Sequence, residues 1–223
     1  MLGPCLALGA CHFDAIPLAG AGSDSSRPAD AASPDGLTSA DASGPDASAP
    51  DAWAVEVRVN VNGSELPGLD YPGLWAADPG DGGVCGGLEW TVTGPIDNTR
   101  DDPLFQSLMY AYDVIRCRVG AGLPAGTYRV GLYFAEVYFG AGCPGGFGRC
   151  VFDVALEGAT VYPGLDLLAE GEGCAMSDIS DSGHPVVKTF TIRIDDGALD
   201  VGLSPAGGSG CAEISAIDVV APP

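Results

Sequence analysis

Basic residues are scarce in this sequence of 223 residues, and lysine occurs only once, at Lys188. Nine lysines and arginines stand against 30 aspartates and glutamates, which gives a formal net charge of −21. A field of this sign repels phosphate backbones, so we expect no nucleic-acid partner. The sequence also has no cluster of lysines and arginines that would bind an anionic lipid surface.

Residues typical of metal sites and of catalysis are equally sparse. The chain has two histidines, His12 and His184, and its cysteines form no C-x-x-C pair, which argues against zinc. It contains no G-x-S-x-G string and no phosphate-binding P-loop. We therefore expect a protein that is not an enzyme and has no cofactor. Two alternatives stay open: a glycosidase pair such as Asp101 with Glu136, and a structural calcium in the acidic loop Asp78 to Asp81.

The first 22 residues contain a short apolar run and a cysteine that together predict export. Residues Leu2 to Ala10 are apolar but too few to span a bilayer as a helix. The string Leu8-Gly9-Ala10-Cys11 resembles a bacterial lipobox, in which the cysteine becomes the lipidated first residue of the mature protein. We therefore expect Cys11 to carry a lipid anchor. No lysine or arginine precedes the apolar run, so we also expect the natural start to lie upstream.

Residues 23–51 have the composition of a disordered stalk. They are almost entirely Ser, Asp, Ala, Pro and Gly, and Leu37 is their only large apolar side chain. Such a segment cannot bury enough apolar surface to offset the entropy of ordering it. As a flexible chain it would hold a domain roughly 30 Å from its anchor. We expect one folded domain, residues 52–223, in an extracytoplasmic location such as a bacterial cell envelope.

Six cysteines fall within the expected domain, and their even number predicts three disulfides in an oxidising compartment. They are Cys85, Cys117, Cys143, Cys150, Cys174 and Cys211. The segment between Cys143 and Cys150 is short and rich in glycine, so we expect these two cysteines to pair locally. The other four allow three connectivities, which the sequence alone leaves open.

From Val55 onward, apolar residues recur with a period of two, as in strands that bury one face. Val55, Val57, Val59 and Val61 alternate with polar residues, and Tyr128 to Phe134 repeats the pattern. Further strands are expected at 88–93, 112–119, 149–156, 186–194, 198–203 and 213–220, with turns at 123–126, 157–158 and 195–197. The only helical candidate, Asp101 to Tyr110, is limited to a turn or two by Pro103. These features predict an all-β fold, an antiparallel β-sandwich of the jelly-roll type.

Several strings in this domain resemble the malectin family of carbohydrate-binding domains. The most similar string is Leu132-Tyr133-Phe134-Ala135-Glu136-Val137-Tyr138-Phe139. Others precede it at Asp70, Gly73, Trp75 and Asp78 and from Asp102 to Tyr110, and Phe152-Asp153-Val154 and Asp166-Leu167 follow it. The similarity extends from Val55 to Val220.

This resemblance implies a jelly-roll sandwich that binds glucose-containing disaccharides or glycans through aromatic residues on loops at one end. The positions that match the family's site are Tyr110, Tyr138, Phe139 and, in a looser alignment, Trp90. The family also uses an aspartate shortly before its last strand, which residues 207–211 lack, and Glu213 is a candidate to replace it.

The chemistry of sugars supports the same residues. Aromatic faces pack on the C–H face of a pyranose, and carboxylates accept hydrogen bonds from its hydroxyls. We include Glu136 as a site residue on this ground, although Glu136 and Asp153 are also candidates for purely structural hydrogen bonds to backbone donors. We expect Trp75 and Phe134 to pack in the core.

Taken together, the sequence predicts non-catalytic binding of glucose-containing di- or oligosaccharides by a membrane-tethered, extracytoplasmic domain. The alternative is a surface module that binds another protein and has lost sugar binding.

Overall fold

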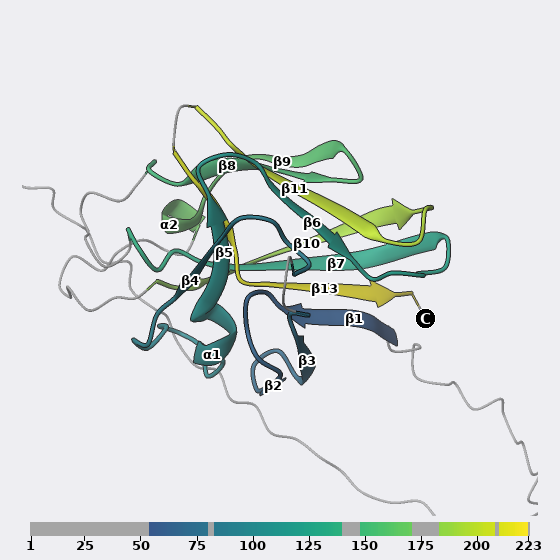
Figure 1. The fold of residues 1–223 in the computed structure, drawn as a ribbon, viewed down its shortest axis with the longest axis horizontal. Coiled ribbons are helices and arrows are strands. Elements are labelled where there is room, and N and C mark those ends of the chain that lie inside the picture. The colour runs from purple at the N-terminus through teal and green to yellow at the C-terminus, as the bar shows by residue number, and fades with distance from the viewer. Residues whose placement is uncertain (1–53, 80–82, 140–147, 171–182, 208–209, 223) are drawn as a thin grey trace, which may run out of the picture. The chain divides into compact units, whose positions relative to one another are not determined.

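The computed structural model describes residues 54–79, 83–139, 148–170, 183–207 and 210–222. Cys11, residues 1–22 and the stalk at 23–51 lie outside the described residues, as do Cys143 and Cys174. Within the described ranges the regular structure is almost all β-strand, with two helices of one turn each. The expected all-β, largely antiparallel sandwich is therefore confirmed (Figure 1).

The larger sheet has six strands in the order β10-β7-β13-β1-β3-β2. Its strands are β10 (Pro185–Ile194), β7 (Gly126–Ala135), β13 (Ala216–Ala221), β1 (Ala54–Asn60), β3 (Gly73–Ala77) and β2 (Leu66–Gly68). Neighbouring strands are antiparallel except β1 and β3, which form a short parallel pair.

The opposing sheet has four antiparallel strands in the order β6-β11-β8-β9. They are β6 (Ile115–Val119), β11 (Leu199–Pro205), β8 (Val151–Leu156) and β9 (Ala159–Asp166), and the short helix α2 (Leu167–Glu170) follows β9. The main core lies between the two sheets, where Leu132 and Phe134 of β7 pack in one cluster with Val154 of β8 and Leu203 of β11. The alternation in β7 thus places Phe134 in the core, as predicted.

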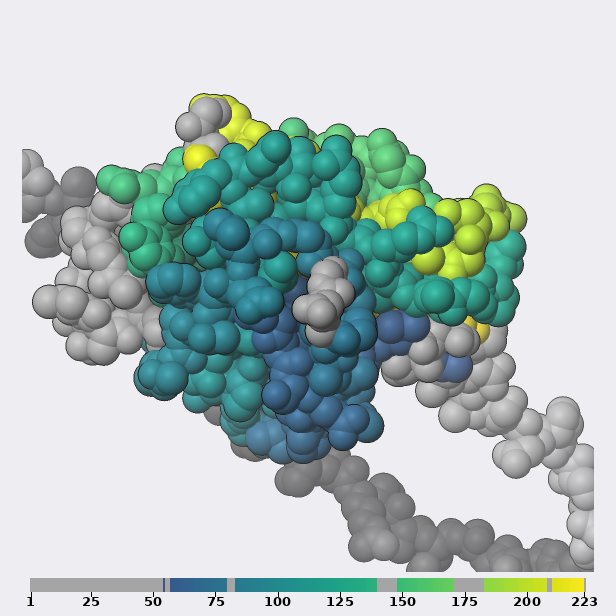
Figure 2. Space-filling model, in the orientation of Figure 1, coloured from purple at the N-terminus to yellow at the C-terminus, as the bar shows by residue number. Residues whose placement is uncertain are grey.

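A third, smaller sheet crosses the end of the sandwich at which β7 ends (Figure 1). It consists of β12 (Ala212–Ile214), β5 (Ser107–Ala111) and β4 (Leu88–Thr91), with the helix α1 (Asp102–Phe105) directly before β5. Figure 2 shows the atoms in the orientation of Figure 1. The first half of the described chain, coloured blue to teal, lies at the front of this view. This third sheet is the layer that carries the candidate site.

The segment around α1 covers the other face of β7 with a second apolar cluster. Tyr133 and Ala135 of β7 pack there with Trp75, Leu104 and Phe105, all of them buried. Both faces of the end of β7 are therefore buried. Trp75 is a core residue, as predicted.

Besides β2, β3 and α2, which were not predicted, three elements differ from the sequence-based prediction. The helix α1 ends at Phe105, so residues 107–111 form β5 instead of continuing the predicted turn of helix. The strand β9 was not predicted, because it is an exposed edge strand that contains Pro163 and Gly164 and shows no alternating apolar pattern. The predicted strand 213–220 is broken at Ser215, since β12 belongs to the small sheet and β13 to the large one.

Two disulfides lie in the described part of the chain, Cys85–Cys117 and Cys150–Cys211. The second corrects the expected local pairing of Cys150 with Cys143. Strand β8, which begins directly after Cys150, pairs with β11, and the chain leaving β11 passes Cys150 before it enters β12. Sheet pairing, which the local spacing of the cysteines does not reveal, therefore decides the partner of Cys150.

No helix among the described residues is long and apolar enough to cross a membrane.

Candidate functional site

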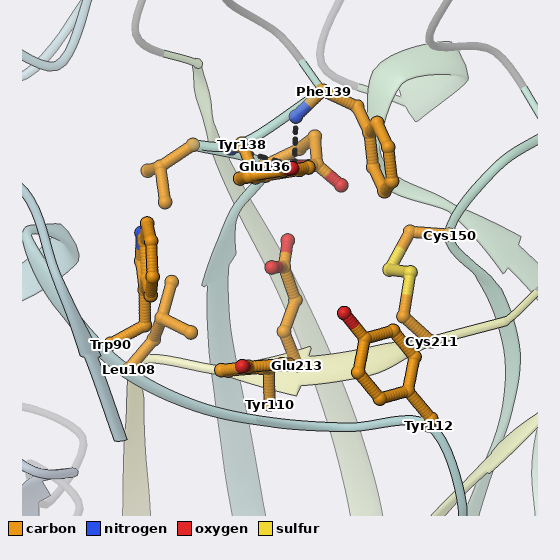
Figure 3. Close-up of a pocket in the computed structure, with 11 residues that line it drawn as sticks. Trp90, Leu108, Tyr110, Tyr112, Glu136, Tyr138, Phe139, Cys150, Cys211 and Glu213 are labelled. Atoms are coloured by element: carbon orange, nitrogen blue, oxygen red, sulfur yellow. Dashed lines mark hydrogen bonds between the residues drawn. A yellow bond between two sulfur atoms is a disulfide. The ribbon is translucent and has the colours of Figure 1, made fainter. Parts of the chain in front are cut away.

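A pocket of about 190 Å³ opens where the small sheet meets the segment that follows β7 (Figure 3). Its lining comes from β4, β5, β12, the residues after β7 and one disulfide. The lining residues are Trp90, Leu108, Tyr110, Tyr112, Glu136, Val137, Tyr138, Phe139, Cys150, Cys211 and Glu213. Five of these eleven side chains are aromatic and two are carboxylic acids.

The aromatic rings form walls that stand nearly perpendicular to one another. The ring of Trp90 lies 6.0 Å from that of Tyr138 and 6.2 Å from that of Tyr110, at angles of 84° and 88°. The ring of Tyr112 packs edge to face on the ring of Tyr110, and the ring of Phe139 packs in the same way on that of Tyr138. Figure 3 shows Tyr138 and Tyr110 facing each other across the pocket, with Trp90 closing one side.

Much of this aromatic surface is accessible to solvent. Tyr112 is 72% exposed, Tyr138 63% and Trp90 40%, which is unusual for large apolar side chains so close together. Clustered exposed aromatic residues of this kind mark a contact surface for a ligand or a partner.

Glu136 fixes the backbone of the segment that carries two of these rings. Its Oε1 accepts hydrogen bonds from the backbone N–H groups of Tyr138 at 2.9 Å and Phe139 at 2.8 Å. The residue is only 2% exposed. Its burial raises the pKa of the carboxyl, and the two N–H groups oppose that rise because they stabilise the charged form. Glu136 therefore holds the backbone of Tyr138 and Phe139 in place and also lines the pocket.

Glu213, on β12, lies at the centre of the pocket with its carboxyl directed toward Glu136 (Figure 3). It is 4% exposed, and its Oε1 has no hydrogen-bond partner in the structure. Burial, and then the charge of Glu136, raise the pKa of Glu213 well above its usual value. From the sequence, Glu213 was named as a candidate to replace an aspartate that residues 207–211 lack.

Among the described residues, one cluster has the spacing of a metal site: Glu136, Cys150 and Glu213, whose ligand atoms lie within 4.8 Å of one another. Cys150 is bound to Cys211 in a disulfide and offers no thiolate, which leaves two carboxyls. In the loop considered for calcium, the oxygens of Asp78 accept the backbone N–H groups of Asn62 and Val84. Asp81 lies outside the described residues.

The structure places all five sugar-site residues of the sequence-based prediction on this one pocket. They are Trp90, Tyr110, Glu136, Tyr138 and Phe139. The sequence reasoning did not include Tyr112, although its two-residue spacing from Tyr110 would place both rings on one side of an extended chain. It also did not include the Cys150–Cys211 wall, which depends on the cysteine pairing.

The glycosidase pair considered from the sequence is not formed. Asp101 does not line the pocket that contains Glu136. Its carboxylate accepts the backbone N–H groups of Leu69, Asp70 and Tyr71 and holds the loop beside α1. Asp153 is also structural, since it accepts the N–H of Gly164 across the β8–β9 pair.

Comparisons with known proteins match this fold to one family model and to several solved structures. The malectin domain model matches residues 55–217. A Bacteroides uniformis beta-glucuronidase is 23% identical with a TM-score of 0.55, over 73% of this chain and 18% of that one. The ANX2 ectodomain from Arabidopsis thaliana is 15% identical with a TM-score of 0.57, over 74% and 49% of the two chains. The Arabidopsis ANXUR1 extracellular domain is 13% identical with a TM-score of 0.57, over 74% and 48%.

The likenesses to these solved structures concern the fold alone, because each identity is below 25%. The chain spans about a fifth of the beta-glucuronidase and about half of each plant ectodomain. Among curated proteins, none matches the chain in sequence.

Proposed function

This chain belongs to the malectin domain family, and from that premise we propose that it binds glucose-containing di- or oligosaccharides without transforming them. A malectin domain is a carbohydrate-binding or extracellular module. The proposal assigns the binding to the pocket lined by Trp90, Tyr110, Tyr112, Tyr138 and Phe139.

One observation carries the proposal: exposed aromatic faces surround buried carboxyls in a single pocket. A pyranose ring has an apolar face of C–H groups and a rim of hydroxyls. The first packs on aromatic rings, and the second donates hydrogen bonds to carboxylate oxygens. Tyr138 and Tyr110 face each other across the pocket and are suited to enclose such a ring from two sides (Figure 3).

One of the two carboxyls of the pocket is committed to a structural role, because Oε1 of Glu136 accepts two backbone N–H groups. A glycosidase places its two carboxyls on the two sides of the scissile bond. In this pocket the carboxyl of Glu213 is directed toward that of Glu136 (Figure 3). We therefore propose binding alone.

The test is a glycan array with the full chain, exported into an oxidising compartment, followed by calorimetry against maltose, nigerose and longer glucans. We expect the double variant Tyr138→Ala, Phe139→Ala to lose at least about tenfold in affinity, because two stacking surfaces are removed. Leu74→Ala is the matched control, since Leu74 is 60% exposed and does not line the pocket.

A folded chain that binds no glycan would contradict the proposal. A protein partner that binds the chain, and is lost with the same two rings, would then favour the surface-module alternative.

We also propose that the domain works outside the cytoplasm, held to a membrane by a lipid on Cys11 and spaced from it by residues 23–51. The Cys85–Cys117 and Cys150–Cys211 disulfides support an oxidising compartment. The lipobox-like string at Cys11 and the composition of the stalk support the tether.

A further inference from the structure

The carboxyl of Glu213 is the least explained polar group in the pocket. It is 4% exposed, yet one of its oxygens has no hydrogen-bond partner among the described residues. Leaving a buried acceptor unpaired costs about 1–3 kcal/mol. The side chain is directed into the pocket rather than into the core (Figure 3). Its geometry therefore suits a donor that arrives with a ligand.

A second carboxyl, that of Glu136, lies within 4.8 Å of the first. Two carboxylates so close together repel each other, and a positive charge between them removes that repulsion. Glu136 already accepts two backbone hydrogen bonds on Oε1, and among the described residues no donor is bonded to its other oxygen. An ammonium group has three N–H donors and a positive charge, whereas a hydroxyl offers one donor and no charge.

The aromatic walls are arranged as a box around this pair. Trp90 stands nearly perpendicular to both Tyr110 and Tyr138, and the carboxyl of Glu213 lies between the latter two rings (Figure 3). Aromatic boxes of this shape bind cations, because the faces of the rings carry negative partial charge. A neutral pyranose needs stacking faces but gains nothing from the two acids beyond ordinary hydrogen bonds.

The charged groups of the surrounding protein leave this position open. Arg149 lies over the ring of Phe139, with its guanidinium carbon 5.5 Å from the ring centroid. It forms no ion pair with Glu136 or Glu213 among the described residues. The formal net charge of −21 also attracts cationic ligands toward the chain.

We propose that the sugar bound in this pocket carries a protonated amine, as in a 2-amino-2-deoxyglucose unit, with its ammonium held by Glu213 and Glu136 inside the Trp90, Tyr110 and Tyr138 walls. The inference rests on the proposed carbohydrate binding and names the substituent that the site selects. Sugars with carboxylate or sulfate groups at this position are rejected by the same two acids.

Binding of the amine is coupled to a proton. Burial and the neighbouring Glu136 raise the pKa of Glu213, so the free protein keeps this proton to a higher pH than usual. An ammonium beside Glu213 favours the ionised form, so binding releases the proton, and affinity for the amine rises with pH while the amine stays charged. The other titratable groups facing the pair are Tyr110 and Tyr112 from the β5 side and Tyr138 from the segment after β7, and Asp166 adds to the field at Glu136.

The experiment uses the full chain and three methyl β-glycosides that differ only at C2, those of glucosamine, N-acetylglucosamine and glucose. Calorimetry near neutral pH, in two buffers of different ionisation enthalpy, measures both affinity and proton release. We expect the glucosaminide to bind about tenfold tighter than the glucoside and to be the only one of the three that releases a proton. The Glu213→Gln variant keeps the shape and loses the charge, so we expect the preference for the glucosaminide over the glucoside to disappear.

Glu65→Gln is the matched control, because Glu65 is exposed and does not line this pocket. Equal affinity for the three glycosides, or amine binding without proton release, would overturn the inference and leave the proposed sugar binding intact. Absence of binding to any glycan would overturn both. Proton release is measured on the unaltered chain, so the inference stays testable if Glu213→Gln fails to fold.

Discussion

At the scale of single residues, the pocket depends on how closely Gly183 approaches the backbone of Glu136. Gly183 has a positive φ of +84°, and a Cβ on it would stand 2.3 Å from the carbonyl oxygen of Glu136. The carbonyl oxygen of Gly183 accepts a hydrogen bond from the N–H of Asp97. A glycine here lets the chain that leads into β10 pass directly behind the residues that hold Tyr138 and Phe139.

We expect Gly183→Ala to lower the free energy of unfolding by about 3 kcal/mol, because it combines backbone strain with a clash. It should also weaken glycan binding, since Glu136 must shift. Denaturant unfolding and calorimetry on the same samples measure the two effects. Gly158→Ala is the control: Gly158 also has a positive φ, +76°, but nothing lies within 4 Å of its Cβ position. We expect that variant to cost about 1 kcal/mol and to bind normally. Equal losses of stability and of glycan affinity in the two variants would show that backbone strain, and not the contact with Glu136, causes them.

Individual residues also show how far the sequence predicts the site. Tyr138 and Phe139 were predicted because they match site positions of the family that the sequence resembles, and their place at the end of an alternating segment just before glycines agrees with exposure. For Glu136, hydrogen bonds to backbone donors were considered from the sequence, but the donors were not identified. They are the N–H groups two and three residues ahead. The meeting of Glu136 and Glu213 had no local signal, because 77 residues separate them and only the sheet pairing joins them. Their role in binding a sugar stays a prediction.

At the scale of elements, the two described disulfides connect different parts of the fold. Cys150–Cys211 joins the start of β8 to the segment before β12 and lines the pocket. Cys85–Cys117 joins the segment before β4 to β6 and lies outside the pocket. They close chain separations of 61 and 32 residues, respectively. The two bridges therefore allow the stability of the fold to be separated from the shape of the site.

We expect each double serine variant to lose about 4 kcal/mol of stability, because both bridges constrain long loops of the unfolded chain. Only the Cys150→Ser, Cys211→Ser variant should also lose glycan affinity, as its pocket wall is released. Thermal unfolding and calorimetry, both well below the lowered midpoint, distinguish the two. If Cys85→Ser, Cys117→Ser reduced affinity as strongly, the pocket would depend on general stability rather than on its own disulfide.

The elements themselves were predicted where one face is buried and the other is exposed. β10 and β11 lie close to their predicted bounds for this reason. The edge strand β9 lacks this contrast between a buried and an exposed face. The strands β12 and β13 are separated by Ser215 alone, and the sequence around this residue gives no sign of a break. Which strands share a sheet depends on pairing between segments that lie far apart in the sequence. The period of the apolar residues carries no information about that pairing.

At the scale of the whole molecule, the proposed tether makes a claim about where the chain resides. If Cys11 carries the lipid, the Cys11→Ser variant should leave the membrane fraction and appear in the soluble fraction, with its glycan affinity unchanged. Metabolic labelling with a fatty-acid analogue and detergent-phase partitioning measure the change. Cys5→Ser is the matched control, since Cys5 lies outside the lipobox-like string. Retention of the Cys11→Ser chain in the detergent phase would contradict the tether.

The pocket is assembled from strand ends and the segment after β7, while the sandwich core lies between other residues of the same strands. Trp90, Tyr112 and Tyr138 fill no part of that core, and their substitution leaves its packing untouched. Selection can therefore exchange these side chains one at a time at little cost to folding. Such a scaffold is evolvable: its descendants can acquire new ligands while inheriting an unchanged frame.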